Sequence, residues 1–444
     1  MQQYVEKHHK RILDTFQYVW KNPETGYREW KTHRYLKAQF EELGYTVTEA
    51  GNIPGFYADI DTGRPGPTLA IFGEMDGLII PDHPECDKET GAVHACGHAL
   101  QVAALVGIAG ALKEDGALDG LCGRIRLIAV PAEEGIELAF RLKLREEGII
   151  GYRSGKIEFL RRGFLDGVDL SFMVHALVAP LHHGYMNGGS NGLISKTVRF
   201  EGVAAHAGGL PHEGINALYA ATTALQAINA LRETFEDKNH IRVHPIITEG
   251  GTSVNVIPSA VKLETYVRAA NMPAAVEANR KIDRAIAAAA ASIGAKVHIN
   301  DTPGSWPRFT EPVMMKAFEE AMDEVLETKD CSKDYWNAGC SDMGDIGSLM
   351  PTVHAYIGGA EGKEHGNNYR ITDPIACVES AKLQIEALKR LLNNGAARAK
   401  EAIANYKPYF TCKEDYFAYV NALNRDYDAV IYKENGDVLL AIGN

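Results

Sequence analysis

The segment Thr68–Asp76, TLAIFGEMD, decides how the rest of the sequence is read. It begins as an apolar run and ends in acidic residues, a pattern typical of a buried strand with polar groups beyond its carboxyl end. Similar apolar runs occur at 124–130 and 170–174. A helical pattern at 97–112 lies between the run that begins at Thr68 and the run at 124–130. This alternation predicts an α/β sheet with helices on its faces.

Polar residues follow the other predicted strands as well. The pair Glu133 and Glu134 follows the second strand, and His175 follows the third. A later apolar run at 353–357 leads into a loop that contains His365. Open α/β sheets bind their ligands at the carboxyl ends of strands, so these side chains are expected to share one site.

The stretch 92–98, AVHACGH, adds Cys96 and His98 to this set. Thiolate and imidazole are both good ligands for zinc-type ions, although an isolated pair of this kind is more often structural, since Cys is commonly buried. Five ligands would serve two metal ions about 3.5 Å apart with one shared ligand, leaving Glu133 as general base. The candidate ligands are Cys96, His98, Glu134, His175 and His365.

Length and charge narrow the class of protein. A chain of 444 residues exceeds what one core usually organises, so we expect two domains or one domain inserted into another. The net charge of -12 argues against nucleic-acid or anionic-membrane partners. No spanning segment or signal peptide is visible, and the seven cysteines lack a pairing pattern, so we expect a cytoplasmic protein with reduced thiols.

A second pattern begins near residue 187 and ends near 302. Its order, β-α-β-β-α-β, predicts a ferredoxin-like α+β module. Because the α/β pattern resumes after Trp306, the module is expected to be inserted into the first domain. The predicted strands are 195–200, 242–248, 261–267 and 296–299, and the predicted helices are 216–231 and 273–293.

These patterns give a discontinuous first domain, residues 1–187 and 303–404, and an inserted domain, residues 188–302. Residues 405–444 form a C-terminal extension rich in Tyr and Phe. We expect this extension to pack over the first domain.

Five motifs, taken in order, resemble the metal-dependent amidohydrolase/aminoacylase branch of the zinc carboxypeptidase-aminoacylase superfamily. That branch includes bacterial p-aminobenzoyl-glutamate hydrolases and plant auxin-conjugate hydrolases. The similarity extends to about residue 395, and the segment 341–345 is similar to the p-aminobenzoyl-glutamate hydrolase subunits in particular. The motifs are Gly73–Leu78, His94–His98, Pro131–Gly135, His206–His212 and Asn255–Pro258.

The resemblance implies a mixed-sheet, zinc-peptidase-like catalytic domain and makes the inserted module a lid and dimerisation domain of a homodimer. It implies two divalent metal ions, Zn or Mn, bridged by Cys96, with Glu133 as catalytic base. From the lid, His206 would stabilise the oxyanion, often across the dimer, while Asn255 and Arg268 would bind the substrate carboxylate. Taken alone, His206 and Arg268 could equally be ordinary surface residues.

Two departures from the family pattern limit these implications. Ala99 stands where the family usually has Asp, so a carboxylate that would orient a ligand is missing or supplied elsewhere, with Asp76 and His94 as candidates. The stretch 136–154 is unusually long and basic. It either borders the mouth of the site and contributes to specificity or forms a solvated helix. Glu74 is left out of the ligand set, although distant relatives have a metal-binding His there.

The expected activity is metal-dependent hydrolysis of an N-acyl or N-aroyl amino acid, of the p-aminobenzoyl-glutamate kind, or of a dipeptide. A dipeptidase or carboxypeptidase of the same superfamily is the alternative. Less favoured hypotheses are a cysteine hydrolase that uses Cys96 and a non-catalytic subunit. Loss of activity with a chelator would separate the metal-dependent enzymes from the cysteine hydrolase.

Overall fold

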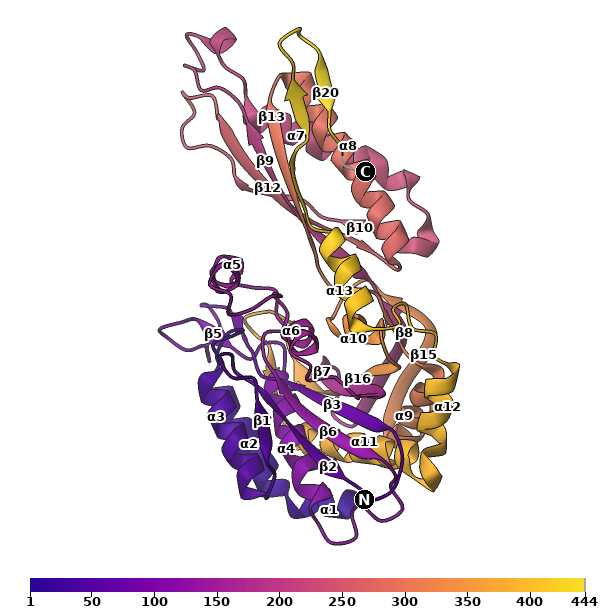
Figure 1. Ribbon diagram of the computed structural model, residues 1–444. Coiled ribbons are helices and arrows are strands. Elements are labelled where there is room, and N and C mark those ends of the chain that lie inside the picture. Colours follow the sequence, from indigo (N-terminus) through magenta and orange to yellow (C-terminus); the bar gives the residue numbers. More distant parts are fainter. Residues whose placement is uncertain (443–444) are drawn as a thin grey trace. The chain divides into compact units, whose positions relative to one another are not determined.

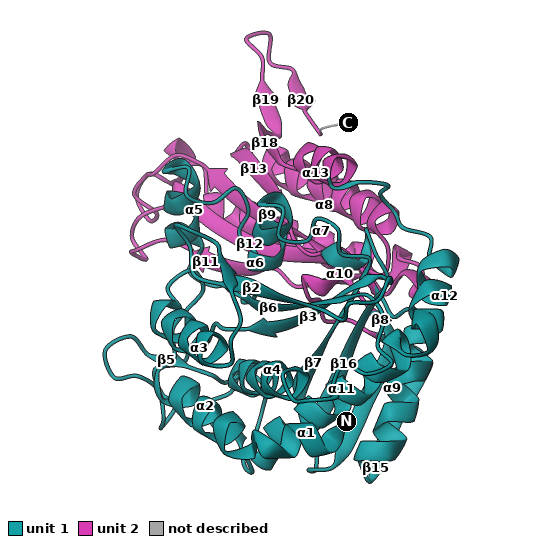
Figure 2. Cartoon of the chain, turned by 60° about the horizontal axis from the view of Figure 1, so that its bottom comes forward, with its two compact units in different colours: residues 1–189, 309–336, 345–413 teal, residues 190–308, 337–344, 414–444 magenta. Residues whose placement is uncertain are grey.

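The computed structural model describes residues 1–442, and the chain divides into two compact units (Figure 1, Figure 2). Unit 1 comprises residues 1–189, 309–336 and 345–413. Unit 2 comprises 190–308, 337–344 and the chain from 414 onward. None of the helices in the described part of the chain has the length and apolarity needed to cross a membrane.

Unit 1 is built on a mixed sheet with the order β1-β2-β6-β3-β7-β16-β8-β14. The central strands β6, β3, β7 and β16 run parallel, whereas β1, β2 and β8 are antiparallel to their neighbours. The strands are β1 Val47–Glu49, β2 Phe56–Asp61, β3 Thr68–Glu74, β6 Arg124–Val130, β7 Leu170–Val178, β8 His183–Ser190, β14 Arg308–Phe309, β15 Thr328–Asn337, β16 Thr352–Glu361 and β17 Arg370–Ile371, with β4 Leu78–Ile79 and β5 Ala92–Val93 as a separate pair.

Helices cover this sheet, and α4 (His98–Leu112) is the most central of them. All of its residues are buried because it is apolar on every face, and it packs against β3, α2 and α11. The parallel sheet with buried helices confirms the predicted α/β class. The other helices of unit 1 are α1 Gln2–Lys7, α2 His9–Lys21, α3 Trp30–Glu42, α5 Leu138–Glu146, α6 Gly155–Arg161, α9 Pro312–Val325, α10 Met343–Gly347, α11 Ile375–Leu392 and α12 Ala397–Asn405.

Unit 2 contains the predicted ferredoxin-like module. Its sheet has the order β10-β12-β9-β13-β18, with β11 also paired to β12, and helices α7 and α8 pack together on it (Figure 1). Asn216 and Asn271 cap α7 and α8 by accepting hydrogen bonds from their first-turn amides. The elements are β9 Gly192–Glu201, α7 Ala217–Leu231, β10 Arg242–Val243, β11 Ile246–Glu249, β12 Ala260–Ala269, α8 Met272–Ile293 and β13 Lys296–Pro303.

The C-terminal segment differs from its prediction. Residues 405–413 belong to unit 1, whereas from residue 414 onward the segment belongs to unit 2, where β18 (Arg425–Asp428) pairs antiparallel with β13. Helix α13 (Lys413–Ala422) carries Tyr419, whose ring meets Trp306 edge to face at 5.4 Å. A hairpin of β19 (Val430–Tyr432) and β20 (Val438–Leu440) follows. The segment thus extends the sheet of unit 2 by one strand.

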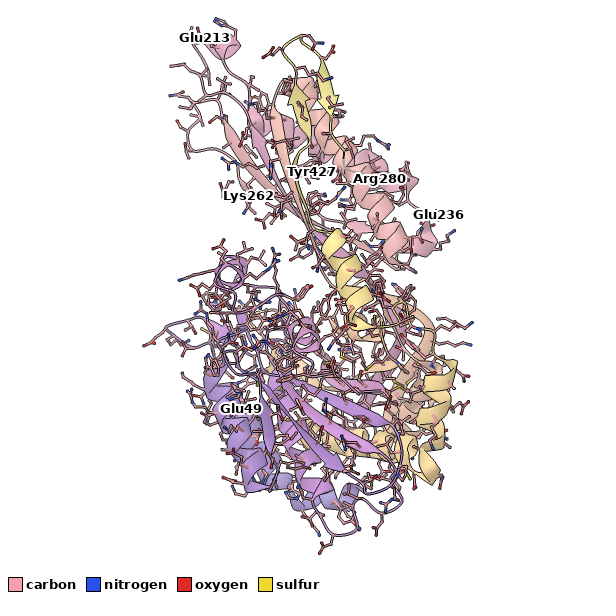
Figure 3. All side chains as sticks on the ribbon, viewed as in Figure 1. Glu49, Glu213, Glu236, Lys262, Arg280 and Tyr427 are labelled. Carbon is pink, nitrogen blue, oxygen red and sulfur yellow. The ribbon has the colours of Figure 1, made fainter. Side chains whose placement is uncertain are left out.

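A buried ionic cluster joins β18 to the rest of unit 2. Lys196, fully buried in the middle of β9, donates to Asp283 and Asp301, and Arg425 of β18 donates to the same two carboxylates. Tyr427, labelled in Figure 3, donates from its hydroxyl to Asp283 Oδ2 at 3.0 Å. Two cations and two anions balance each other, which makes their burial tolerable.

Replacing Lys196 with Met should destabilise unit 2 by about 3–5 kcal/mol, because it leaves two buried carboxylates with one cation. Scanning calorimetry of the full chain would measure the lower transition temperature. Lys262→Met on the neighbouring strand β12 (Figure 3) is the control, since the Lys262 side chain is 38% exposed and pairs with Glu264, a surface contact worth about 0–1 kcal/mol. Equal transition temperatures for the two variants would contradict a stabilising role for the cluster.

The attachment of β18 should also depend on pH. Hydrogen bonds from His298 to Asp428 (2.8 Å) and Asp426 (2.7 Å) raise the pKa of His298 against the opposing effect of partial burial. Because the pKa of His298 is higher in the folded than in the unfolded state, its protonation stabilises the fold. This stabilisation is complete below the unfolded-state pKa of about 6.5 and is lost as the pH rises through the folded-state pKa. Hydrogen exchange, corrected for intrinsic rates, should therefore show better-protected β18 amides at mildly acid than at alkaline pH. The effect should be small, because His298 is 40% exposed, and should vanish in His298→Gln.

Candidate active site

The site in unit 1 starts at the turn between β5 and α4. Gly97 has a φ of 85° and ends the turn, and α4 begins at His98. A Cβ on Gly97 would lie 2.5 Å from both the Ala176 Cβ and the Tyr369 hydroxyl. Only glycine fits there, because both the left-handed backbone and the close approach exclude a side chain. The turn directs Cys96 and His98 to the same side.

Two groups of potential ligand atoms share Cys96. Its thiol lies 3.4 Å from His175 Nε2, and Cys96, His98 and His175 have ligand atoms within 4.8 Å of one another. Cys96, Glu364 and His365 form a second group within the same limit. Glu364 was not predicted, although it adjoins His365 in the sequence. His365 itself has a φ of 59° and donates its backbone N–H to the Ala95 carbonyl.

The acidic pair after β6, Glu133 and Glu134, lies in the same cluster of ligand atoms. Glu133, Glu134 and His98 have ligand atoms within 4.8 Å of one another, and Glu134 Oε1 lies 3.5 Å from His365 Nε2. Glu134 is buried, which raises its carboxyl pKa, and its Oε1 accepts no hydrogen bond from any residue in 1–442. A buried oxygen without a hydrogen-bond donor is suited to a cation. The five predicted ligands and Glu133 therefore lie together in unit 1.

Asp76 supplies the carboxylate whose absence at Ala99 was noted from the sequence. His98 Nδ1 lies 2.8 Å from the Asp76 carbonyl oxygen and 3.2 Å from Oδ1, so it is the protonated nitrogen and Nε2 faces the ligand cluster. Asp76 Oδ2 accepts a hydrogen bond from the Glu134 amide at 2.9 Å. Burial acts to raise the pKa of Asp76, but the hydrogen bond and charge of His98 and the hydrogen bond from the Glu134 amide together lower the pKa to about 2.

A buried ion pair lies beside His98. Glu74 Oε2 is 3.1 Å from His98 Nε2, and the other oxygen of Glu74 accepts from Lys156, which is fully buried. Gln101 donates to Glu74 Oε2 at 2.7 Å. Burial opposes ionisation of Glu74, yet Lys156, His98 and His175 together keep its pKa below the usual value. Nothing in the sequence singles out Lys156, because its partner precedes it by 82 residues.

The donor set fits two divalent ions of the zinc type. A thiol, imidazoles and a carboxylate with an unsatisfied oxygen are the ligands such ions prefer, and one thiol common to two groups suits a pair of ions. Burial and the neighbouring Glu134 raise the pKa of the Cys96 thiol well above its usual value. Metal binding therefore has to displace a proton from Cys96.

Three predicted site residues lie in unit 2. His206 is exposed, and its Nδ1 accepts hydrogen bonds from the amides of Gly208 (3.2 Å) and Gly209 (2.9 Å). The proton of the neutral ring is then on Nε2, which becomes a donor. Asn255 lies beside this loop, since its carbonyl accepts from the Ala207 amide at 2.9 Å.

Arg268 is half-buried near the end of β12. Its guanidinium donates to His244 Nε2 at 3.2 Å and to the Ala338 carbonyl at 3.5 Å, and it lies over the Tyr266 ring. No carboxylate within residues 1–442 is recorded as an ion-pair partner of Arg268, so no acidic side chain there balances its positive charge.

Comparison with known proteins agrees with the motifs. Residues 188–297 match the peptidase dimerisation domain family. An uncharacterised hydrolase of Sinorhizobium fredii is 24% identical over 89% of this chain and 96% of its own length. One of the p-aminobenzoyl-glutamate hydrolase subunits of Escherichia coli is 32% identical over 60% of this chain, and the indole-3-acetyl-aspartic acid hydrolase of Enterobacter agglomerans is 34% identical over 49%. The matched regions span 53% and 48% of those two relatives.

A solved structure from Bacillus subtilis, described as a dinuclear metal-binding peptidase from the M20 family, shares the fold. Its TM-score is 0.65 at 21% identity, and the match covers 87% of this chain and 99% of that chain. The predicted resemblance to the aminoacylase branch is confirmed, and two of the relatives are named as hydrolases of N-acyl amino acids.

Replacing Asp76 with Ala should lower metal affinity by about 10- to 100-fold, because the Glu134 amide loses its acceptor and His98 keeps only the backbone carbonyl of residue 76. Competition with a chromogenic chelator would measure the affinity. Asp61→Ala, at an exposed position on β2, is the control and should bind metal as the wild type does. Equal affinities for the two variants would show that Asp76 does not orient the ligands.

Proposed function

With the chain's relationship to the metal-dependent amidohydrolases and peptidases of the M20 family as premise, we propose that it hydrolyses the amide bond of N-acyl or N-aroyl amino acids. The proposed substrates resemble p-aminobenzoyl-glutamate, and the products are a carboxylic acid and a free amino acid. One observation carries the proposal: two groups of ligand atoms share Cys96, and Glu133 lies against one of them.

Glu133 is assigned the proton transfers. Two divalent ions, held by Cys96 and four further ligands, would polarise the scissile carbonyl and lower the pKa of water. Glu133 takes a proton from the attacking water and delivers it to the leaving amine, which must be protonated to depart. Its position, within 4.8 Å of ligand atoms of His98 and Glu134, supports this role. The remaining proposed ligands are His98, Glu134, His175 and His365.

Residues of unit 2 are assigned to the substrate. Arg268 binds its free carboxylate through the guanidinium fork, with Asn255 as a second contact. His206 donates from Nε2 to the oxyanion that develops on the attacked carbonyl. The orientation of its ring, fixed through Nδ1 by Gly208 and Gly209, supports that assignment. In p-aminobenzoyl-glutamate and indole-3-acetyl-aspartate, which relatives are named for, an aromatic acyl group is joined to an acidic amino acid.

The alternatives are weaker on physical grounds. A cysteine hydrolase needs a thiol whose pKa is lowered, whereas burial and acidic neighbours raise that of Cys96. A dipeptidase or carboxypeptidase would use the same metal centre and differs only in the acyl group. A non-catalytic subunit would have no need of Glu133.

The same proposal includes the metal, the assembly and the location of the enzyme. Zn or Mn is the proposed metal, because the thiol and imidazole donors suit zinc and the carboxylates also suit manganese. The match of residues 188–297 to a dimerisation domain supports a homodimer through that domain. No disulfide bond joins any of the cysteines within the described residues 1–442, which supports a cytoplasmic location for the proposed enzyme.

Replacing Glu133 with Gln should reduce kcat on p-aminobenzoyl-glutamate by about 10²- to 10⁴-fold while the metal content stays unchanged, because only proton transfer is lost. Cys96→Ser is the comparison, and it should lose metal and activity together. The measurements are a hydrolysis screen of N-acyl amino acids, p-aminobenzoyl-glutamate and dipeptides after reconstitution with Zn or Mn, and metal analysis of each variant. Wild-type activity in Glu133→Gln would refute the proposal.

A further inference from the structure

The insertion 136–154 lies outside the mechanism described so far, and one of its basic residues is buried. Lys143 and Arg145 are exposed on α5, whereas Arg141 on the same helix is only 1% exposed. The sequence suggested a border of the site or a solvated helix, and neither places an arginine in the interior. A buried guanidinium requires partners that satisfy it.

Those partners lie at the two ends of the insertion. Arg141 donates from Nη2 to the carbonyl oxygen of Glu134, and from Nη1 to that of Arg153 at 2.9 Å. Gly26 makes room for this guanidinium, since a Cβ there would lie 2.4 Å from Nη2. The Tyr27 ring lies 5.7 Å from the guanidinium carbon. Arg141 thus ties the end of the insertion to the backbone of Glu134.

The peptide groups around Glu133 and Glu134 are all anchored. Gly155, the residue after the insertion, donates its amide to the Ala132 carbonyl at 3.1 Å, which fixes the peptide before Glu133. Asp76 accepts from the Glu134 amide at 2.9 Å, which fixes the next peptide. Arg141 holds the Glu134 carbonyl, which fixes the third.

Anchored peptides on both sides of an α-carbon fix its φ and ψ, and so fix the direction of its side chain. The loop needs this support because Ala132 has a φ of 56°, an uncommon conformation for a residue with a Cβ. Glu29 holds it from the other side by accepting the Ala132 amide at 2.8 Å. Without Arg141 the Glu134 carbonyl would keep only the local hydrogen bond from the Ile136 amide, at 2.9 Å, and would lose its link to the insertion's helix.

We propose that Arg141 is a positioning residue and that the insertion 136–154 braces the Glu133–Glu134 loop. Arg141 donates to the Glu134 carbonyl and Gly155 donates to the Ala132 carbonyl, so the loop is held on both sides of the acidic pair. These contacts fix the carboxylates of Glu133 and Glu134 in the positions required for proton transfer and metal binding. This inference rests on the proposed function and adds to it a role for the insertion other than substrate selection.

Arg141→Ala tests the brace, with Arg145→Ala as a matched control from the exposed face of the same helix. In the metal-reconstituted full chain, Arg141→Ala should lower kcat by about 100-fold with a smaller change in KM, since a misplacement of about 1 Å costs that much. Added guanidinium ion, at concentrations that leave the fold intact, should restore part of kcat by refilling the vacated site. Arg145→Ala should match the wild type and show no response to guanidinium.

A second measurement needs no substrate. Chelator competition should show weaker metal binding in Arg141→Ala than in Arg145→Ala, because Glu134 is a proposed ligand. This readout separates the two proposals: a wild type that cleaves no N-acyl amino acid refutes the proposed function, while weakened metal binding still supports the brace. If Arg141→Ala fails to fold, Arg141→Lys is measured instead, and it should have a lower kcat and weaker metal binding than Arg145→Ala, because an ammonium cannot reach both carbonyl oxygens as the guanidinium does.

Three outcomes would overturn the brace. One is wild-type kcat and metal affinity in the Arg141 variant. Another is a change confined to KM and to substrate preference, which would make the insertion a border of the binding site. The third is a lowered melting temperature with unchanged kcat and metal binding at low temperature, which would make Arg141 a structural residue only.

Discussion

The Asp76 carboxylate is the interaction on which the site depends. One of its oxygens and its backbone carbonyl hold the ring of His98, and its other oxygen holds the amide of Glu134. It therefore joins two segments of unit 1, one at the start of α4 and one after β6. Because β3 and β6 are parallel neighbours in register, with Glu74 opposite Val130, the end of β3 is next to the loop after β6. The register of the sheet places the Asp76 carboxylate next to the His98 ring and the Glu134 amide. Its charge-assisted hydrogen bonds then fix the orientation of both.

Much of this arrangement follows from patterns local in the sequence. The buried strands are apolar runs, their carboxyl ends are marked by a change to polar residues, and parallel strands gather those ends at one edge. The strand-end positions of Glu134, His175 and His365 were therefore predictable, and the spacing of Cys96 and His98 in one turn added these two residues. Lys156, Arg141 and Glu29 were not, because a single charged residue in a helix or loop looks the same whether it is solvated or buried. Only the tertiary structure shows that each has a partner far away in the chain.

The same distinction applies to unit 2. The order of strands and helices was enough to predict a ferredoxin-like module, since that order has a characteristic sheet topology. The added strand β18 was not predictable, because a four-residue strand carries little periodicity and its place at the edge of β13 is decided by Lys196, Asp283, Asp301 and Arg425 together. Three of these four residues precede β18 by more than a hundred positions, so a pattern read within a short window could not reveal the pairing.

The two buried charge clusters differ in one respect that bears on function. In unit 2 the cations and anions of the cluster balance, and the cluster is complete as it stands. In unit 1 the carboxyl groups of Glu74, Asp76, Glu133 and Glu134 converge with one buried ammonium, that of Lys156, among the residues that contact them. Burial raises the pKa of Glu134 and of the Cys96 thiol, which is how a protein lowers excess negative charge when no cation is present. Divalent cations remove the same excess by replacing those protons. The acidic excess at the strand ends is thus a property of a site organised to exchange protons for metal, whereas the balanced cluster in unit 2 is organised to hold a strand in place.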